Sequence, residues 1–259
     1  MRLSAFASLA LVAALPAPNA PLPQSPPAII AAVDRTEQEL HHAIEGWDTT
    51  RALSRDVVLL ALYQQRLIRH VAEDGALART VIRLRPTLRD DVTARADLTR
   101  LSLLSPRPAG PPHIGPAAPA ARLLAWYHEA QRRFHIRWQT LAAVNFVESA
   151  FGRVRNVSGA GARGPMQFEP ASWKVYGLGG NVDDPHDAIL GAANYLAADG
   201  GVHDERAALF HYNPSRLYVD AIRRYAARMS RDRYAFYEYY NWQVFFRTAS
   251  GYRRVTGPR

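Results

Sequence analysis

The sequence predicts a mainly α-helical protein that ends in a small β-hairpin. Along most of the chain, apolar residues recur with the spacing of an amphipathic helix. The proline-rich segment Ser105–Ala121 interrupts this pattern, and short β-type runs follow only near the C-terminus. The chain is therefore divided into successive parts. These are an export signal (1–20), a proline-rich leader (21–28), a helical region (29–104), a proline-rich segment (105–121), a second helical domain (122–230) and a C-terminal extension (231–259).

The N-terminus has the pattern of a secretory signal peptide. Arg2 supplies the positive charge, Leu3–Leu15 the apolar core, and Ala14, Ala17 and Ala20 the small residues of a cleavage site. The apolar run is too short to span a bilayer, so we expect cleavage after Ala17 or Ala20 and no transmembrane anchor. The alternative is a cytoplasmic protein with an apolar tail. The leader that follows is expected to be extended or disordered.

The helical region contains several amphipathic patterns. They run over Ile30–Ile44, Val57–Val71, Thr80–Leu84 and Asp90–Leu104. Glu37 interrupts the first apolar stripe, and Pro86 separates the last two patterns. The neighbouring His41 and His42 point about 100° apart on a helix, so we expect solvated side chains and no metal site. Without a catalytic constellation, this region is expected to be a scaffold or spacer.

The segment Ser105–Ala121 carries six prolines among small residues. This composition is typical of a linker or of an extended strap on the surface. The candidate catalytic residues all lie beyond it. We therefore expect the part of the chain after Ala120 to fold and act without the helices that precede it.

The second helical domain has its own helix signals. Leu123–Phe134 carries the apolar face of the first helix, and Asp184 with Pro185 and Asp187 is a typical helix start. The other helices are predicted over Trp138–Ala150, from Pro170, and over Ala188–Ala198, Asp204–His211 and Arg216–Met229.

One acidic residue of this domain lies on an apolar helix face. Leu141, Val144, Glu148 and Phe151 follow at helical spacing, and Gly152 ends the helix. A carboxyl group on such a face loses water, and desolvation favours its protonated form. A protonated glutamic acid near neutral pH can donate to a glycosidic oxygen. Glu148 is therefore a candidate general acid; the alternative is a side chain that reaches solvent at the helix end.

Four sequence blocks follow one another in this domain. They are Glu148-Ser149, Ser158–Pro170 with Gly164-Pro-Met-Gln-Phe168 inside it, Asp184–Leu196 and Ala208–Pro214. In this order they resemble the soluble lytic transglycosylases, lysozyme-like enzymes that cut the glycan of bacterial peptidoglycan. The resemblance covers roughly residues 120–229 and implies a lysozyme-like α-helical fold for the second domain.

The resemblance also implies which residues form the site. The family's only catalytic carboxylate corresponds to Glu148, with Ser149 and Tyr195 in supporting positions. The family's sugar cleft corresponds to Ser158, Met166, Gln167, Tyr212 and Asn213. At one position, usually apolar in the family, this chain has Glu169. That carboxylate changes the wall of one sugar subsite.

Each site residue has an expected role. Gln167 is expected to bind an N-acetyl amide, because an amide side chain both donates and accepts. Tyr212 is expected to hydrogen-bond near the reacting sugar and to hold Glu148, while Ser149 braces the turn behind it. Structural roles are expected for Asp183 in a loop, for the helix caps Asp184 and Asp187 and for His211 at a helix end.

The resemblance implies a reaction with one carboxylate and no cofactor. In the family, the glutamate protonates the leaving oxygen of the β-1,4 MurNAc–GlcNAc bond, and the N-acetyl group assists. The same residue then activates the muramyl C6 hydroxyl, which closes a 1,6-anhydro ring. Two alternatives stay open: a muramidase in which Glu169 positions water, and an inactive peptidoglycan-binding scaffold. The presence of Glu148, Gln167, Tyr212 and Asn213 argues against the scaffold.

The composition bears on partners and location. The formal net charge is +9, and Lys174 is the only lysine among the basic residues. Such a chain is drawn to polyanions. Its arginines are scattered and no nucleic-acid-binding motif is present, so we expect peptidoglycan strands and anionic cell-wall polymers as partners, and no nucleic acid. The chain has no cysteine, which excludes disulfides, thiolate metal sites and a cysteine lipid anchor. The expected location is outside the cell or in the periplasm.

The C-terminal extension has a different pattern. Tyr234–Trp242 is dense in aromatic residues, and Gln243–Thr248 and Tyr252–Thr256 around Ser250-Gly251 predict a hairpin. The aromatic rings are expected either to cover the preceding domain or to stack on sugars.

Overall fold

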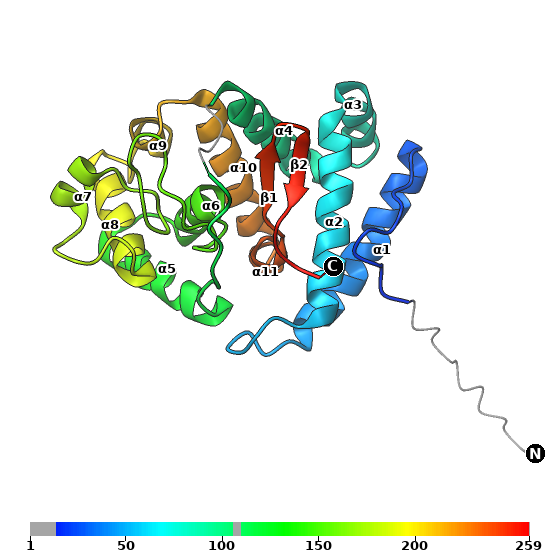
Figure 1. Cartoon of the computed structure of the whole chain (residues 1–259), viewed down its shortest axis with the longest axis horizontal. Helices are drawn as coiled ribbons and strands as arrows, with labels where there is room; N and C mark the ends of the chain where they lie inside the picture. Colours follow the sequence, from blue (N-terminus) through cyan, green and yellow to red (C-terminus); the bar gives the residue numbers. More distant parts are fainter. Residues whose placement is uncertain (1–13, 106–109, 259) are drawn as a thin grey trace, which may run out of the picture.

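The structure is a computed structural model that describes residues 14–105 and 110–258. It confirms a mainly α-helical fold with one two-stranded antiparallel sheet in this part of the chain (Figure 1). Most of the predicted export signal, residues 1–13, lies outside the described residues. None of the helices in the described ranges is both long and apolar enough to cross a membrane.

The N-terminal helical region forms four α-helices and a short 3-10 turn, as its periodicity predicted. These are α1 (Pro26–Glu45), α2 (Arg55–Glu73), α3 (Gly75–Leu84), η1 (Pro86–Leu88) and α4 (Arg89–Leu104). α1 begins earlier than expected, because the end of the leader forms its first turn with Pro26 in a position that suits proline. The chain just before α1 contacts the rest of the protein: Leu22 of the leader packs on the core, and Arg66 donates to the carbonyl oxygen of Ala20 (2.7 Å), the last residue of the predicted export signal. The leader is therefore without helix or strand up to Ser25, which fits the extended alternative, and it differs from the expectation only from Pro26 on, where it is helical.

The second domain consists of six helices among the described residues. They are α5 (Ala120–Phe134), α6 (Trp138–Ser149), α7 (Pro170–Tyr176), α8 (Pro185–Ala198), α9 (Glu205–Tyr212) and α10 (Arg216–Arg231). After them come α11 (Ala235–Asn241) and the predicted hairpin, β1 (Phe245–Thr248) and β2 (Gly251–Arg254). The hairpin pairs Phe245 with Arg254 and Thr248 with Gly251.

The N-terminal helices do not form a separate unit. α10 packs against both α4 and α6, and α11 packs against α2 (Figure 1). Side chains from both regions, such as Leu60, Val92, Tyr127 and Ile222, belong to one continuous hydrophobic cluster. The sequence did not predict this sharing. Removal of the N-terminal helices would expose one side of α10 to water.

Buried polar groups also join the two regions. The fully buried Glu238 accepts from Gln64 Nε2 (3.0 Å) and from Arg228 (3.3 Å), and its Oε1 lies 2.7 Å from His41 Nε2. Asp91, also buried, accepts from the hydroxyl of Tyr239. If the regions separated, Glu238 would lose Gln64 and His41, and Asp91 would lose Tyr239. We call this set, centred on Arg228 and Glu238, the ion-pair cluster.

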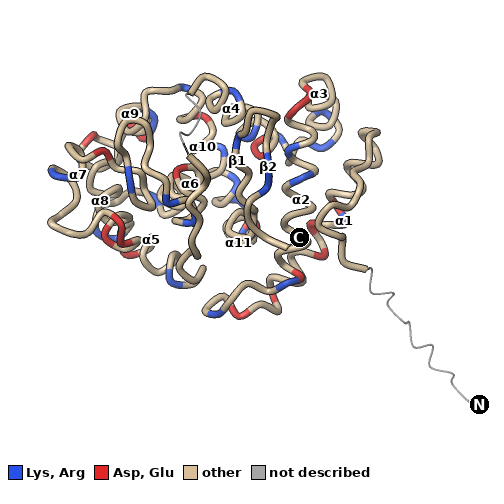
Figure 2. The backbone as a smooth tube through the Cα atoms, in the orientation of Figure 1, with Lys and Arg blue, Asp and Glu red and all other residues tan. Residues whose placement is uncertain are grey.

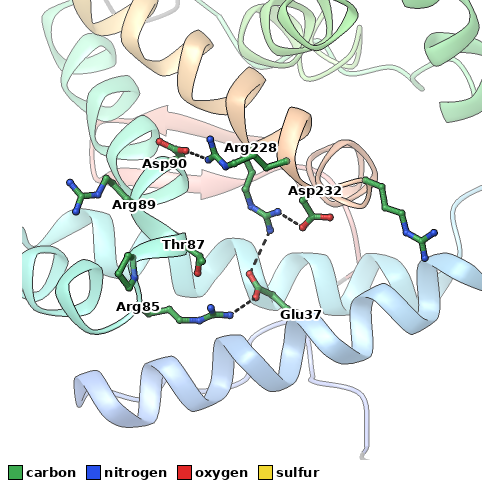
Figure 3. A pocket seen from close by; sticks show the side chains of 10 residues that line it. Glu37, Arg85, Thr87, Arg89, Asp90, Arg228 and Asp232 are labelled. Atoms are coloured by element: carbon green, nitrogen blue, oxygen red, sulfur yellow. Dashed lines mark hydrogen bonds and ion pairs between the residues drawn. The ribbon is translucent and has the colours of Figure 1, made fainter.

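Two expectations about α1 change because of the ion-pair cluster. Glu37 is a partner of Arg85 (3.3 Å) and Arg228 (3.7 Å), so the polar break in the apolar stripe is a contact between helices (Figure 3). Burial raises the pKa of Glu37 to about 7, and the nearby Glu238 adds to the shift. His41 is not simply solvated, because it contacts Glu238. His42 is exposed, as expected.

The proline-rich segment is a strap and not a free linker over its described part. Arg155 N donates to the His113 carbonyl (2.8 Å), and Gly115 N donates to the Arg153 carbonyl (2.9 Å). The Asn156 side chain binds the strap as well, because its Oδ1 accepts from His113 N (2.8 Å). A side chain on Gly115 would collide with the Arg155 guanidinium. The strap therefore lies along the segment that follows α6.

The aromatic extension covers the second domain, as the first of its two interpretations predicted. Phe236, Tyr239 and Trp242 are buried. Tyr239 and Trp242 pack on Phe146 of α6, with ring centroids 5.3 and 5.9 Å away. These rings have no face left for a sugar.

Candidate active site

Glu148 lies at the end of α6, where the chain makes an unusual turn. Ala150, Phe151 and Gly152 all adopt left-handed backbone conformations, with φ of 51°, 63° and 82°. Ser149 holds this turn: its hydroxyl donates to the Pro165 carbonyl (2.5 Å) and accepts from Gly152 N (2.8 Å). The turn ends the helix directly after Glu148 and ties it to the loop that carries Gln167.

A cleft of about 480 Å³ brings most of the expected site residues together. Those that line it are Glu148, Ser158, Gln167, Glu169, Tyr195, Tyr212 and Asn213. Met166 does not line the cleft. Its side chain is completely buried, so its expected part in the sugar cleft is corrected to a core contact.

The loop over residues 158–168 has a strained geometry that presents Gln167. Gly164 has a φ of 79°, and a Cβ there would lie 2.0 Å from the Val182 carbonyl oxygen, so only glycine fits. Gln167 also has a positive φ, of 50°. Its Nε2 donates to the carbonyl oxygens of Gly164 (3.1 Å) and Asn156 (3.3 Å). None of the described residues donates to its Oε1, which is therefore available to a ligand.

Ser158 and Glu169 mark the two ends of this loop. The Ser158 hydroxyl accepts from Ala162 N (2.9 Å), so it closes a turn at the rim of the cleft. Glu169 is exposed and precedes the first turn of α7. Its position on the wall agrees with the sequence, and its carboxylate is open to solvent.

An aromatic wall forms the side of the cleft opposite the loop. The ring of Tyr195 lies 5.2 Å from that of Tyr212 and 4.5 Å from that of Tyr176. The Tyr195 hydroxyl donates to the His211 carbonyl (3.1 Å) and so joins α8 to α9. The Tyr212 hydroxyl donates to the Met166 carbonyl (2.5 Å). The expectation that Tyr212 holds Glu148 by a hydrogen bond is therefore corrected.

The surroundings of Glu148 favour its protonated form. Burial raises its pKa to about 7, and the only opposing cause is the nearby hydroxyl of Tyr218. Neither cause is another charged group. A carboxyl with this pKa is protonated in an appreciable fraction of molecules at neutral pH, and its conjugate base is accessible too. Both halves of acid–base catalysis are thus open to one residue.

Tyr218 is the site residue that sequence reasoning missed. It lies in the first turn of α10, and its buried hydroxyl has no hydrogen-bond partner of good geometry among the described residues. It is still close enough to Glu148 to lower that residue's pKa. The sequence pattern did not indicate a role in the site. Tyr218 shares a buried helix face with Val219, Ile222 and Tyr225, so it has the pattern of an ordinary core residue.

The other acidic residues near the cleft have structural partners. Asp184 accepts from His186 N (2.9 Å) and Asp187 N (3.1 Å) as the cap of α8. Asp187 accepts from Asn181 N (2.8 Å), and Asp183 pairs with Arg163. These contacts agree with their expected structural roles.

A larger hollow, of about 790 Å³, lies beside the ion-pair cluster (Figure 3). It contains none of the expected site residues. Most of its charged side chains pair with one another, as Arg231 does with Asp90 and Arg85 with Glu37. The smaller cleft at Glu148 is therefore the better candidate for chemistry.

The comparison with protein families agrees with the site. Residues 126–233 match the family model of the transglycosylase SLT domain. The match runs from α5 past the end of α10 and includes every residue that lines the cleft. This part of the chain is thus similar to the lysozyme-like transglycosylase domains, a class that acts on peptidoglycan. α1 to α4 and the hairpin lie outside the match. Neither the curated proteins nor the solved structures gave a match.

Proposed function

We propose that this protein is a secreted lytic transglycosylase that cleaves the β-1,4 MurNAc–GlcNAc bond and leaves 1,6-anhydro-MurNAc ends. One observation carries the proposal: Glu148 lines the cleft with a pKa of about 7 that no charged neighbour causes. This is the state that a residue needs when it serves as acid first and as base afterwards.

In the first step, protonated Glu148 donates its proton to the glycosidic oxygen. The bond to the muramyl C1 breaks as that oxygen leaves as the GlcNAc hydroxyl. The substrate's own N-acetyl oxygen assists at C1 from the opposite face. Gln167, with its Oε1 free of partners among the described residues, accepts from the N-acetyl N–H and holds the group in position.

In the second step, the Glu148 carboxylate takes the proton of the muramyl C6 hydroxyl. The C6 oxygen then bonds to C1, the N-acetyl oxygen leaves, and the anhydro ring closes without water. Glu148 regains its proton and is ready for another cycle. This outcome requires that the bound substrate exclude water from the cleft.

Two observations favour this outcome over the alternatives. Hydrolysis with a second carboxylate needs Glu169 held in place beside a water at the reacting carbon, but its side chain is exposed to solvent. An inactive scaffold would have no need to keep a buried carboxyl on the cleft wall, because burial without a partner destabilises the fold.

The proposed location is the cell wall or the periplasm. The signal-like pattern of residues 1–20 and the peptidoglycan-acting domain support it together. Figure 2 shows the basic residues spread over the N-terminal helices, the second domain and the hairpin, without one continuous stripe. This distribution suits a general attraction to anionic wall polymers more than a groove for nucleic acid.

The products of the reaction test the proposal. Purified peptidoglycan sacculi are digested with wild-type protein and with Glu148→Gln, and the masses of the released fragments are measured by mass spectrometry. We expect anhydro ends from wild type and a loss of at least about 10²–10⁴-fold in the variant. Reducing ends would identify a muramidase. The absence of products from folded wild type would identify a scaffold.

A further inference from the structure

Glu148 lines a second hollow besides the cleft. This smaller space, of about 180 Å³, runs along the end of α6. Val154 and Tyr225 also line it, and its remaining walls come from regions outside the matched family domain. They include Gln65 and Arg69 of α2, Arg95 and Leu98 of α4, and Phe245 of β1. The N-terminal helices and the hairpin therefore extend the surface that begins at the candidate acid.

Two arginines in this hollow have no acidic partner. Arg69 is only 6% exposed, yet neither its guanidinium nor that of Arg95 forms an ion pair or a hydrogen bond with any of the described residues. Glu73 raises the pKa of Arg69 but does not contact it. Aromatic rings position both side chains instead: the Arg69 guanidinium lies 4.1 Å from the Phe245 ring centroid, and that of Arg95 lies 5.5 Å from the Tyr252 centroid.

This arrangement is unfavourable without a ligand. Burial lowers the pKa of Arg69 to about 10, and the positive charge of Arg95 adds to the shift. Buried arginines in proteins are normally paired, because an unpaired buried charge is costly. The ion-pair cluster around Arg228 shows that this same chain pairs a buried arginine where only stability is needed. Stacking fixes the two guanidinium planes, and such planes bind carboxylates by paired hydrogen bonds.

We propose that Arg69 and Arg95 bind a free carboxylate of the stem peptide of the peptidoglycan substrate. This inference rests on the proposed function and adds a specificity site to it. The hollow has room for a carboxylate and a short stretch of chain. Neither arginine is among the causes of the Glu148 pKa shift. They therefore hold a group attached to the sugar and leave the scissile bond to Glu148.

The test compares charge-matched variants on two substrates. Arg69→Gln and Arg95→Gln are assayed beside Arg89→Gln, which removes an exposed arginine at the start of α4 that lies outside this hollow. The substrates are intact sacculi and glycan strands from which an amidase has removed the peptides. We expect KM on sacculi to rise roughly 10- to 100-fold in the first two variants, with kcat nearly unchanged. Arg89→Gln should match wild type.

The peptide-free strands identify the carboxylate. If the two variants then match wild type, the stem peptide supplies it. A KM that stays high on these strands would overturn the inference, because the amidase has removed every stem-peptide carboxylate. Wild-type KM on both substrates for Arg69→Gln and Arg95→Gln would overturn the inference, as would an equal rise in Arg89→Gln. The half-exposed Arg95 provides a second test if the Arg69 variant does not fold.

A binding measurement separates this inference from the proposed function. Calorimetric titration of wild type and Arg95→Gln with a soluble disaccharide-peptide needs no catalysis. Weaker binding by the variant supports the arginine site even if wild type proves unable to cut glycan. Equal binding contradicts the arginine site even if wild type is an active enzyme.

Discussion

Glu238 of the ion-pair cluster and Glu148 of the cleft both have a desolvated carboxyl group, but the two groups have different surroundings. Glu238 is fully buried, and Gln64, His41 and Arg228 all contact its carboxylate. Glu148 has only the nearby Tyr218 hydroxyl, and its pKa rises to about 7. Burial makes a charge costly in both places. In the cluster, charged and polar partners offset that cost and join helices. In the cleft, no charged partner offsets it, so the Glu148 carboxyl group keeps its proton near neutral pH and can transfer it.

The same contrast explains the role of the N-terminal helices. The cluster takes Gln64 and His41 from the N-terminal region and Arg228 and Glu238 from the end of the chain. The cleft is built wholly from residues inside the family match. The catalytic residues are therefore local in sequence, but the fold that positions α6 and α10 extends well beyond them.

The largest expected effect comes from removing all residues before Ala120. The fragment should aggregate or lose cooperative unfolding, because the side of α10 that packs on α4 and the carboxylate of Glu238 would lose their partners. Circular dichroism melting and gel filtration measure this against the full chain. A soluble, cooperatively melting and active fragment would restore the original expectation of an independent module.

The next effect tests the ion-pair cluster directly. Glu238→Ala should lower the free energy of unfolding by about 3–5 kcal/mol, since it leaves Arg228 and His41 with fewer partners in a buried site. Glu45→Ala, which removes an exposed pair with Arg233, is the control and should change the stability far less, because solvent screens an exposed pair. Urea unfolding at pH 7 gives both values. Similar losses in the two variants would show that the buried cluster contributes no more than a surface pair.

In the cleft, substitution of the glutamate should stabilise the fold instead of destabilising it. The folded-state pKa of Glu148, about 7, lies above its ordinary value of 4.5. The wild type should therefore lose stability as pH rises from about 4.5 to 7, because the unfolded chain ionises first. Glu148→Gln removes this loss and should be more stable than wild type by up to about 3 kcal/mol at pH 8. Below pH 4.5 the two should be equal. Urea unfolding across this range checks the difference, and a variant less stable than wild type at pH 8 contradicts the account.

The smallest effect is expected at Glu169. Because this side chain is exposed, Glu169→Met should change KM only a few-fold, as an exposed charged contact contributes about 1 kcal/mol or less. The products should remain anhydro sugars in wild type and variant alike. If wild type gives reducing ends that disappear in the variant, Glu169 positions a water and the enzyme is a hydrolase.

The sequence predicted the helices and the hairpin better than the contacts between them. Helices such as α2 and α10 carry a strong apolar period, and the hairpin has a clear turn signal. The shared core was missed for a physical reason. Gln64 and Asp91 are polar, so a single sequence suggests that they face water, whereas both are buried against residues more than a hundred positions away.

The candidate site was predicted in part for a similar reason. Glu148 and Gln167 lie in local motifs, so their place in the cleft follows from nearby residues. Other features depend on how helices distant in sequence pack together. They are the hydrogen bond of Tyr212 to Met166, the nearness of Tyr218 to Glu148 and the unpaired guanidinium of Arg69. No local pattern contains that information.

The central claim is that, among the acidic residues that line the cleft, Glu148 holds a transferable proton near neutral pH. Carbon-13 NMR of glutamate side-chain carboxyls, with Glu148→Gln to assign the signal, measures its pKa in the folded protein. The account predicts a titration midpoint near 7. A midpoint near the ordinary glutamate value of 4.5 would contradict it, because Glu148 would then be ionised at neutral pH and could not act as the acid.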